Sequence, residues 1–368
     1  ASCGFTCFYF LLFTNKLFNF SLKEKRCKFG NFLTLKLFMG ATVTTAATKE
    51  TTWGGGEDIQ PLGASYGKMM MWYFILSDSL TFAGFLAAYG FTRFKFMDSW
   101  PIADEVFNHF PFLHGVNAPM YYVALMTFIL IFSSVTMVLA VDAGHQKNNK
   151  KVATYMFLTI IGGFIFLGSQ AWEWKNFITG TYGAVETKGG EILQFVDKEG
   201  KRVALGDFAD TSIGREDAVL TRSKGTWYMS GGTETSVSLE QVKAGLANNP
   251  NVLVRTQFTD PENKHKKVTL TREESLARVN DFNYVVEGAN LVRNEYGHKT
   301  FADLFFFITG FHGFHVTVGV LLNIIIFFNV ISGTYQRRGT YEMVEKVGLY
   351  WHFVDLVWVF VFTFFYLV

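Results

Sequence analysis

The clearest pattern in this sequence is a set of long apolar segments separated by polar stretches. A helix rises about 1.5 Å per residue, so about 20 apolar residues cross the roughly 30 Å of hydrocarbon in a bilayer. Every one of these segments reaches that length. The sequence therefore predicts an all-α polytopic membrane protein, a bundle of five transmembrane helices at residues 70–93, 118–141, 154–178, 302–332 and 346–368.

A long polar stretch, residues 180–300, separates the third and fourth apolar segments. Alternating strings such as KRVALGDF and HKKVTLTREESLARVNDF predict a small mixed α/β domain here. Ser238 with Gln241, and Thr271 with Glu274, have the spacing of a capping box and predict two helix starts. Since this stretch has neither cysteine nor a Gly-rich phosphate loop, a docking or spacer domain is favoured over a catalytic one.

The charges of the links predict how the helices are oriented, because Lys and Arg are enriched in cytoplasmic loops. They gather in the links between spans two and three and between spans four and five, as Lys147, Lys150, Lys151, Arg337, Arg338 and Lys346. The link between spans one and two carries Asp98, Asp104 and Glu105 instead. We therefore expect the N-terminus in the cytoplasm, and the inserted domain and the C-terminus on the extracytoplasmic side.

The N-terminal region differs from the rest of the chain. Residues 1–38 are rich in Phe, Leu, Lys and Asn and have no recognisable signal-peptide cleavage site. One hypothesis is that Met39 is the true start; the other is a basic, aromatic N-terminal extension. Residues 39–69, rich in Thr, Ala and Gly, predict a flexible cytoplasmic tail. The expected divisions after it are helices one to three at 70–179, the inserted domain at 180–300 and helices four and five at 301–368.

Cysteine content and charge narrow the range of functions. The chain has 3 Cys, all before Lys28, so a disulfide framework, an iron–sulfur site or a cysteine-ligated copper is excluded after that point. The net charge is +2, which gives no reason to expect a nucleic-acid partner.

Polar and ionisable side chains lie within the apolar segments, where they persist only when paired or functional. They are Asp78 in the first span, Gln170 and Glu173 in the third, His312 and His315 in the fourth, and Glu345, His352 and Asp355 in the fifth. The spacings of three and seven place the members of each set on one helix face. We expect these faces to turn toward each other and form a buried polar network.

The residues alone leave several readings of these side chains open. The histidines could be structural, paired with a carboxylate or a carbonyl, or they could bind haem or a metal, or relay protons or ions. Asp78, expected about two turns from the start of its span, could be solvated near the membrane surface or act as a protonatable group in apolar surroundings.

Several strings resemble subunit III of haem–copper oxidases, the family of cytochrome c oxidase subunit III, in its five-helix bacterial form. WYFILSDSLTFAGFLAAYGF resembles the third helix of seven-helix members, and GSQAWEW resembles the fifth. TGFHGFHVTVG resembles the sixth, and Glu345 followed by YWHFVDLVW resembles the seventh. The chain departs from that pattern in lacking the first two helices, in carrying Asp78 where the family has Glu, and in its inserted domain.

The resemblance implies a non-catalytic subunit of a proton-pumping enzyme that reduces O2 to water. Haem a, haem a3 and copper are then expected in partner subunits I and II, with no redox centre or metal in this chain. The resemblance further implies that Asp78 supports proton uptake, that phospholipid binds, and that the complex lies in a bacterial inner membrane rather than a mitochondrial one. The inserted domain would dock a cytochrome-bearing complex.

Other functions remain open on the sequence alone. Subunit III of a quinol oxidase fits the same strings, since the electron donor is decided by another subunit. A stand-alone membrane transporter would predict internal repeats or broken helices, and no convincing repeat is visible. A haem-binding membrane protein would predict a visible spectrum of its own.

Overall fold

The computed structural model describes most of the chain after its first 64 residues. The described ranges are 65–108, 110–111, 120–213, 220–223, 226–229, 235–260 and 266–367. The N-terminal extension and most of the tail lie outside these ranges.

Five helices in the described ranges are long and apolar enough to cross a membrane, which confirms the predicted fold class. They are α2 (Tyr66–Lys95), α4 (Tyr121–His145), α5 (Asn149–Thr179), α9 (Lys299–Ile331) and α11 (Glu342–Phe362), the last continued by the π-helical turn η4 (Thr363–Leu367). Helix α2 begins four positions before the predicted span, within the predicted tail, which places Asp78 about three turns inside it rather than two.

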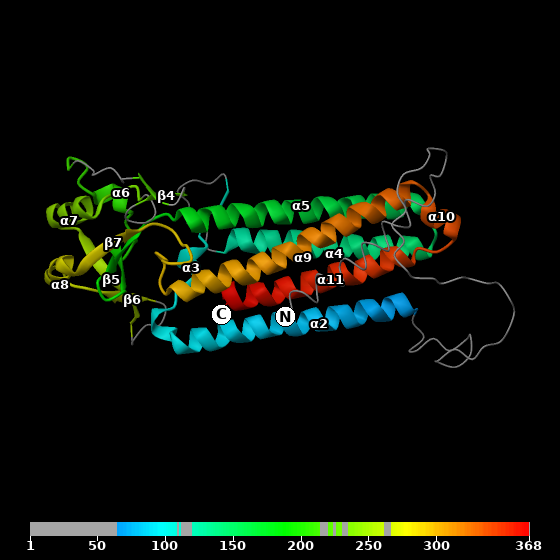
Figure 1. The fold of residues 1–368 in the computed structure, drawn as a ribbon, viewed down its shortest axis with the longest axis horizontal. Coiled ribbons are helices and arrows are strands. Elements are labelled where there is room, and N and C mark those ends of the chain that lie inside the picture. The colour runs from blue at the N-terminus through cyan, green and yellow to red at the C-terminus, as the bar shows by residue number, and fades with distance from the viewer. Residues whose placement is uncertain are drawn as a thin grey trace. The chain divides into compact units, whose positions relative to one another are not determined.

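The helices lie roughly along one another, and α5 packs on both α4 and α9 (Figure 1). Close helix contacts occur at two of the glycines of α9: a side chain at Gly310 would meet the Trp174 ring, and one at Gly319 would meet Trp351 and Tyr350. Small residues at such points let neighbouring helices approach closely. The resulting van der Waals packing stabilises helix association in lipid, where no hydrophobic driving force acts between helices.

The inserted segment contains a five-stranded antiparallel sheet in the order β6-β5-β2-β1-β7. Its strands are β1 (Ala184–Thr187), β2 (Ile192–Asp197), β5 (Val252–Thr259), β6 (Lys267–Thr269) and β7 (Phe282–Val286), and β3 (Leu220–Ser223) and β4 (Thr226–Met229) form a separate hairpin. Alternation along the strands buries Val185, Leu193, Phe195 and Val254 in a core of their own.

Short helices cover this sheet and link the larger elements. They are α6 (Leu205–Phe208), α7 (Leu239–Asn248), α8 (Arg272–Ala277) and η3 (Arg278–Asp281) in the insert, η2 (Met97–Ser99) and α3 (Ala103–Val106) after α2, and α10 (Thr334–Arg338) before α11. Both predicted capping boxes are present, at Ser238 with Gln241 and at Thr271 with Glu274. The insert lies at one end of the bundle, and α10 lies at the other (Figure 1).

Glu295 fastens the insert where it leaves and rejoins the bundle. Its buried carboxylate accepts backbone N–H groups from Thr181, Gly183 and Gly288 at 3.2, 3.2 and 2.6 Å. Gly288 has a positive φ of 67°, and a side chain there would collide with the Ile178 carbonyl oxygen. A glycine is therefore required at this close crossing of the two chain segments.

A partly buried ion pair also ties the insert to the link between α2 and α4. Arg255 on β5 donates to both carboxylate oxygens of Glu105 on α3, at 2.8 and 2.6 Å, and to Gln194 on β2 at 2.6 Å. Burial alone would raise the pKa of Glu105, but the hydrogen bond and charge of Arg255 bring that pKa below its usual range. Nearby, Lys267 donates to the Tyr296 carbonyl at 2.8 Å, and burial lowers its pKa to about 7.

Candidate functional site in the helix bundle

The polar side chains of the bundle form several separate groups in the structure. The first joins α2 and α9, where Asp78 Oδ2 lies 3.2 Å from His315 Nε2. Both residues are buried, at 3% and 2% exposure. Apolar rings surround them, with Phe82 and Phe311 packed against the imidazole. In this group a fully buried acid faces a fully buried base.

Hydrogen bonds fix one proton of this pair on His315 Nδ1 and leave a second proton between His315 and Asp78. His315 Nδ1 lies 2.9 Å from the Phe311 carbonyl oxygen, which can only accept, so Nδ1 donates. Nε2 faces the Asp78 carboxyl, and a hydrogen bond there requires one proton, carried either by Nε2 or by Asp78. Tyr350 on α11 donates to the His315 carbonyl at 3.1 Å and so joins a third helix to the group. The pair can therefore hold and exchange a single proton without a change in its net charge.

The second group lies near the end of the bundle that carries the insert. Gln170 donates to Glu173 at 3.0 Å, and the Tyr366 hydroxyl lies 3.0 Å from each Glu173 carboxylate oxygen. The bonds from Tyr366 connect α5 with η4. Tyr366 was not among the sequence candidates, because a tyrosine within an apolar run gives no signal of which helix it faces.

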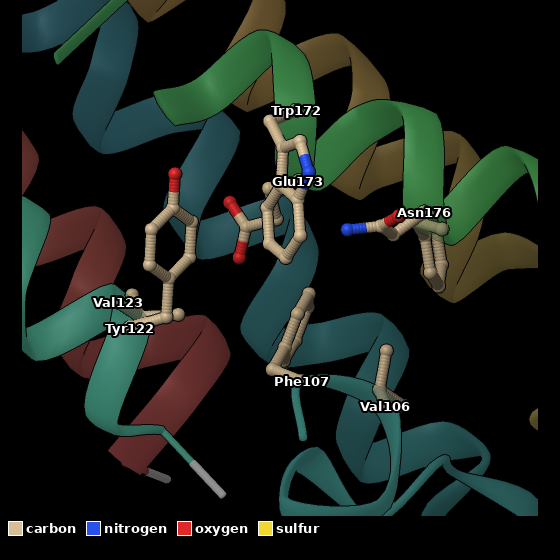
Figure 2. A pocket seen from close by; sticks show the side chains of 8 residues that line it. Val106, Phe107, Tyr122, Val123, Trp172, Glu173 and Asn176 are labelled. Atoms are coloured by element: carbon tan, nitrogen blue, oxygen red, sulfur yellow. The ribbon is translucent and has the colours of Figure 1, made fainter. Parts of the chain in front are cut away.

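A small pocket opens beside Glu173, with room for about one water molecule. Figure 2 shows the Glu173 carboxylate directed toward Tyr122, and the Asn176 amide nitrogen pointing into the same space. The walls are mostly apolar, formed by Val106, Phe107, Val123, Trp172 and Phe177. This group thus has space for about one small polar molecule beside a buried carboxyl.

The third group joins α4 and α11. The Ser134 hydroxyl lies 2.6 Å from His352 Nδ1. Asp355, one turn further along α11, is buried and approaches Ser134 without forming a well-directed hydrogen bond with a described residue. Glu345, two turns before His352, instead pairs with Lys68 of α2 at 2.7 Å and stays about a quarter exposed.

His312 belongs to none of these groups. It is 1% exposed, and neither of its ring nitrogens has a hydrogen-bond partner among the described residues. Its ring packs instead between Phe82, Phe166 and Trp358. The structure thus brings Gln170 to Glu173 and Asp78 to His315, and within the described part of the chain no hydrogen bond joins the first pair to the second.

Tryptophan and hydroxyl pairs supply the other polar ties between helices. Trp351 donates to Ser133 at 3.2 Å and Trp358 donates to Thr127 at 3.0 Å, both from α11 to α4. Across the described residues, no group of three or more His, Cys, Asp or Glu side chains is arranged to hold a metal ion.

Comparison with known proteins finds a similarity for the C-terminal part of the chain. Residues 284–368 match the family model of cytochrome c oxidase subunit III. The matched stretch starts in β7 and contains α9 and α11, so it includes His312, His315, Glu345, His352 and Asp355. Asp78, Gln170 and Glu173 lie outside it.

Individual relatives carry related names. The chain is 41% identical over 81 residues to a "Probable cytochrome c oxidase subunit 3" of Rickettsia conorii, an alignment covering 20% of this chain and 29% of the relative. It is 43% identical over 67 residues to a "Cytochrome c oxidase subunit 3" of Synechocystis sp., covering 18% and 29%. It is 40% identical over 90 residues to a "Quinol oxidase subunit 3" of Bacillus spizizenii, covering 23% and 39%. The chain thus spans roughly a third of the length of these relatives.

Proposed function

We propose that this chain is the non-catalytic subunit III of a haem–copper terminal oxidase, on the premise that residues 284–368 match the family model of cytochrome c oxidase subunit III. The observation that carries the proposal is the match of α9 and α11. The five membrane helices support it. The complex would reduce O2 to water and pump protons, with haem a, haem a3 and copper in partner subunits I and II. We place it in a bacterial inner membrane, with bound phospholipid and a cytoplasmic N-terminus.

Purification of the complex tests this proposal. The chain, tagged at its C-terminus, would be isolated in mild detergent and analysed by mass spectrometry and by its reduced-minus-oxidised visible spectrum. We expect subunits I and II in a fixed ratio to the chain, with a haem a band. A colourless chain that purifies without an oxidase subunit would refute the assignment and favour a transporter.

Within this function, the Asp78–His315 pair would support proton uptake. The support is its geometry: one proton shared between two buried groups, at a site that three helices enclose. An oxidase with Asp78→Asn should inactivate faster during turnover at high pH, when protons are scarce. Asp98→Asn, which alters an exposed acid, serves as the control. Equal inactivation in Asp78→Asn and the unmodified enzyme would remove the pair from this role.

The inserted domain would dock a cytochrome-bearing partner complex. Its support is a separate core and a rigid attachment at Glu295 and Glu105. A deletion that joins Gly183 to Glu287 would remove the sheet and keep the Glu295 attachment. We expect the shortened chain to assemble into the oxidase and to lose association with the partner complex. Retained association would count against docking.

A quinol oxidase is the second candidate, because one relative is named a quinol oxidase subunit 3. The two candidates differ in the electron donor. Turnover with reduced cytochrome c, together with copper in the co-purified subunit II, would identify a cytochrome c oxidase. Turnover with a quinol and a subunit II without copper would identify a quinol oxidase.

A further inference from the structure

The turn between β7 and α9 presents two apolar side chains to the outside. Leu291 is 72% exposed and Val292 is 66% exposed. Other exposed large apolar residues of the insert, such as Phe258 and Leu276, are 41% and 40% exposed. Leu291 and Val292 are adjacent and more exposed than either of those residues, and contiguous exposed apolar patches mark contact sites.

The turn is held in this conformation by its own hydrogen bonds. Asn290 Oδ1 accepts the backbone N–H groups of Val292 and Arg293, both at 2.8 Å, and the Asn290 N–H donates to the Arg293 carbonyl at 2.8 Å. Arg293 also pairs with Glu186 on β1 at 2.6 Å. The two apolar side chains are therefore displayed by a braced turn that cannot readily fold them inward.

The turn lies beside the end of a membrane helix. The Ala289 N–H donates to the Phe177 carbonyl in the last turn of α5 at 3.0 Å, and the chain passes this helix end before it enters α9 (Figure 1). Helix α5 has 31 residues, about 46 Å of length, which exceeds the roughly 30 Å of hydrocarbon. Its last turn should therefore lie in the headgroup region.

Large apolar side chains are exposed at intervals along α5, up to its end beside the turn. Phe157, Phe164 and Ile178 are 51%, 55% and 52% exposed along it. Lys175, one turn before the end of the helix, is exposed as well. A cation at this position is typical of the membrane–water boundary, where its charge reaches the headgroups while its stem covers apolar surface.

We propose that Leu291 and Val292 form a membrane anchor that inserts into the lipid interface beside the end of α5. The occupant we name is lipid, because the turn adjoins the end of a spanning helix at which Ile178 is exposed. The anchor would hold the insert against the membrane at a second place, in addition to its Glu105–Arg255 attachment to the α2–α4 link. This proposal rests only on the chain having membrane-spanning helices, and it does not depend on the oxidase assignment.

Spin-label accessibility tests this anchor. In the full-length chain in lipid nanodiscs, Cys3, Cys7 and Cys27 would be changed to serine, and a single cysteine introduced by Leu291→Cys would carry the label. Leu276→Cys on α8, at the end of the insert away from the bundle (Figure 1), is the matched control. Collision rates with O2, which concentrates in lipid, and with a water-soluble nickel chelate would be compared.

We expect an O2-to-nickel ratio severalfold higher at position 291 than at position 276. A ratio equal to that of the control would show that the turn faces water and would overturn the proposal. Shielding from both reagents would show that protein covers the turn, which also overturns it. Val292→Cys provides an independent second position, so that one misfolded variant cannot decide the result.

Discussion

Asp78 of α2 and His315 of α9 form a buried acid–base pair, 3.2 Å apart, although 237 positions separate them in the sequence. Lipid cannot replace either partner, so removal of one leaves a polar group unpaired inside the bundle. This relationship makes the pair both a tie between two helices and a site for one proton.

The first prediction concerns the coupling of this pair. Asp78→Leu and His315→Leu should each lower the free energy of unfolding by about 1–2 kcal/mol. The double variant should lose less than the sum, because it leaves neither partner unpaired. Unfolding of the purified complex in detergent with increasing SDS would measure all three. Strictly additive losses would show that the pair does not act as a unit.

The second prediction contrasts the two histidines of α9. His312 packs among aromatic rings and has no hydrogen-bond partner among the described residues. His312→Phe should therefore change the free energy of unfolding by about 1 kcal/mol or less. The change is small because the substitution removes an unpaired polar group, which favours the folded state. His315→Phe should be clearly more harmful. A larger loss from His312→Phe, measured by the same unfolding assay, would contradict this packing role.

The third prediction concerns the attachment of the insert. Arg255→Met leaves Glu105 and Gln194 without their shared donor. We expect a loss on the order of 2 kcal/mol, below that of a fully buried pair because Glu105 stays partly exposed. Hydrogen exchange in β5 and β6 should then speed up.

Arg278→Met is the matched control for that change, since it breaks a 3.5 Å ion pair with Glu191 in which the Arg278 side chain is 41% exposed. Such surface pairs contribute about 0–1 kcal/mol. Similar exchange rates in β5 and β6 for the two variants would mean that the Glu105–Arg255 pair does not fasten the insert.

The fourth prediction is a pH dependence set by Lys267. Burial lowers its pKa to about 7, against roughly 10.4 for an unfolded chain. Between these values the unfolded state binds more protons, so the stability of the insert should rise with pH from about 7 to 10. Charges from Glu105, Arg255 and Arg202 face the amine, and the lowered pKa of Glu105 places the titration of that carboxyl at acid pH.

Lys267→Met removes this titration, so the rise in stability across the same pH range should become flatter. Local unfolding of the insert, followed by hydrogen exchange at several pH values, would measure both slopes with the known effect of pH on intrinsic exchange subtracted. An equal slope in the variant and the original chain would assign the pH dependence to another group.

The sequence could predict the membrane helices because a run of about 20 apolar residues is a strong and local signal. The capping boxes at Ser238 and Thr271 were predictable for the same reason, since their partners lie three residues away. Helix α2 was predicted too short, because Tyr66 to Met69 combine a lysine and a glycine with apolar residues and give a weak hydropathy signal.

The partners within the candidate site were not predictable in the same way. Sequence spacing placed His312 and His315 on one helix face, but whether a face meets an acid or a set of rings depends on how helices pack. In the structure Asp78 contacts His315, whereas His312 packs against Phe166 and Trp358. Glu295 and Arg255 were missed altogether, since a single charge in a polar segment carries no sign that it will be buried.

The measurement that tests the central claim most directly is O2 consumption by the oxidase with and without this chain. The chain would be removed from the purified complex and then added back. A non-catalytic subunit III predicts an initial rate of O2 reduction close to that of the intact complex, followed by faster inactivation that re-addition reverses. Loss of the initial rate together with the haem spectrum, or an unchanged time course, would contradict this function.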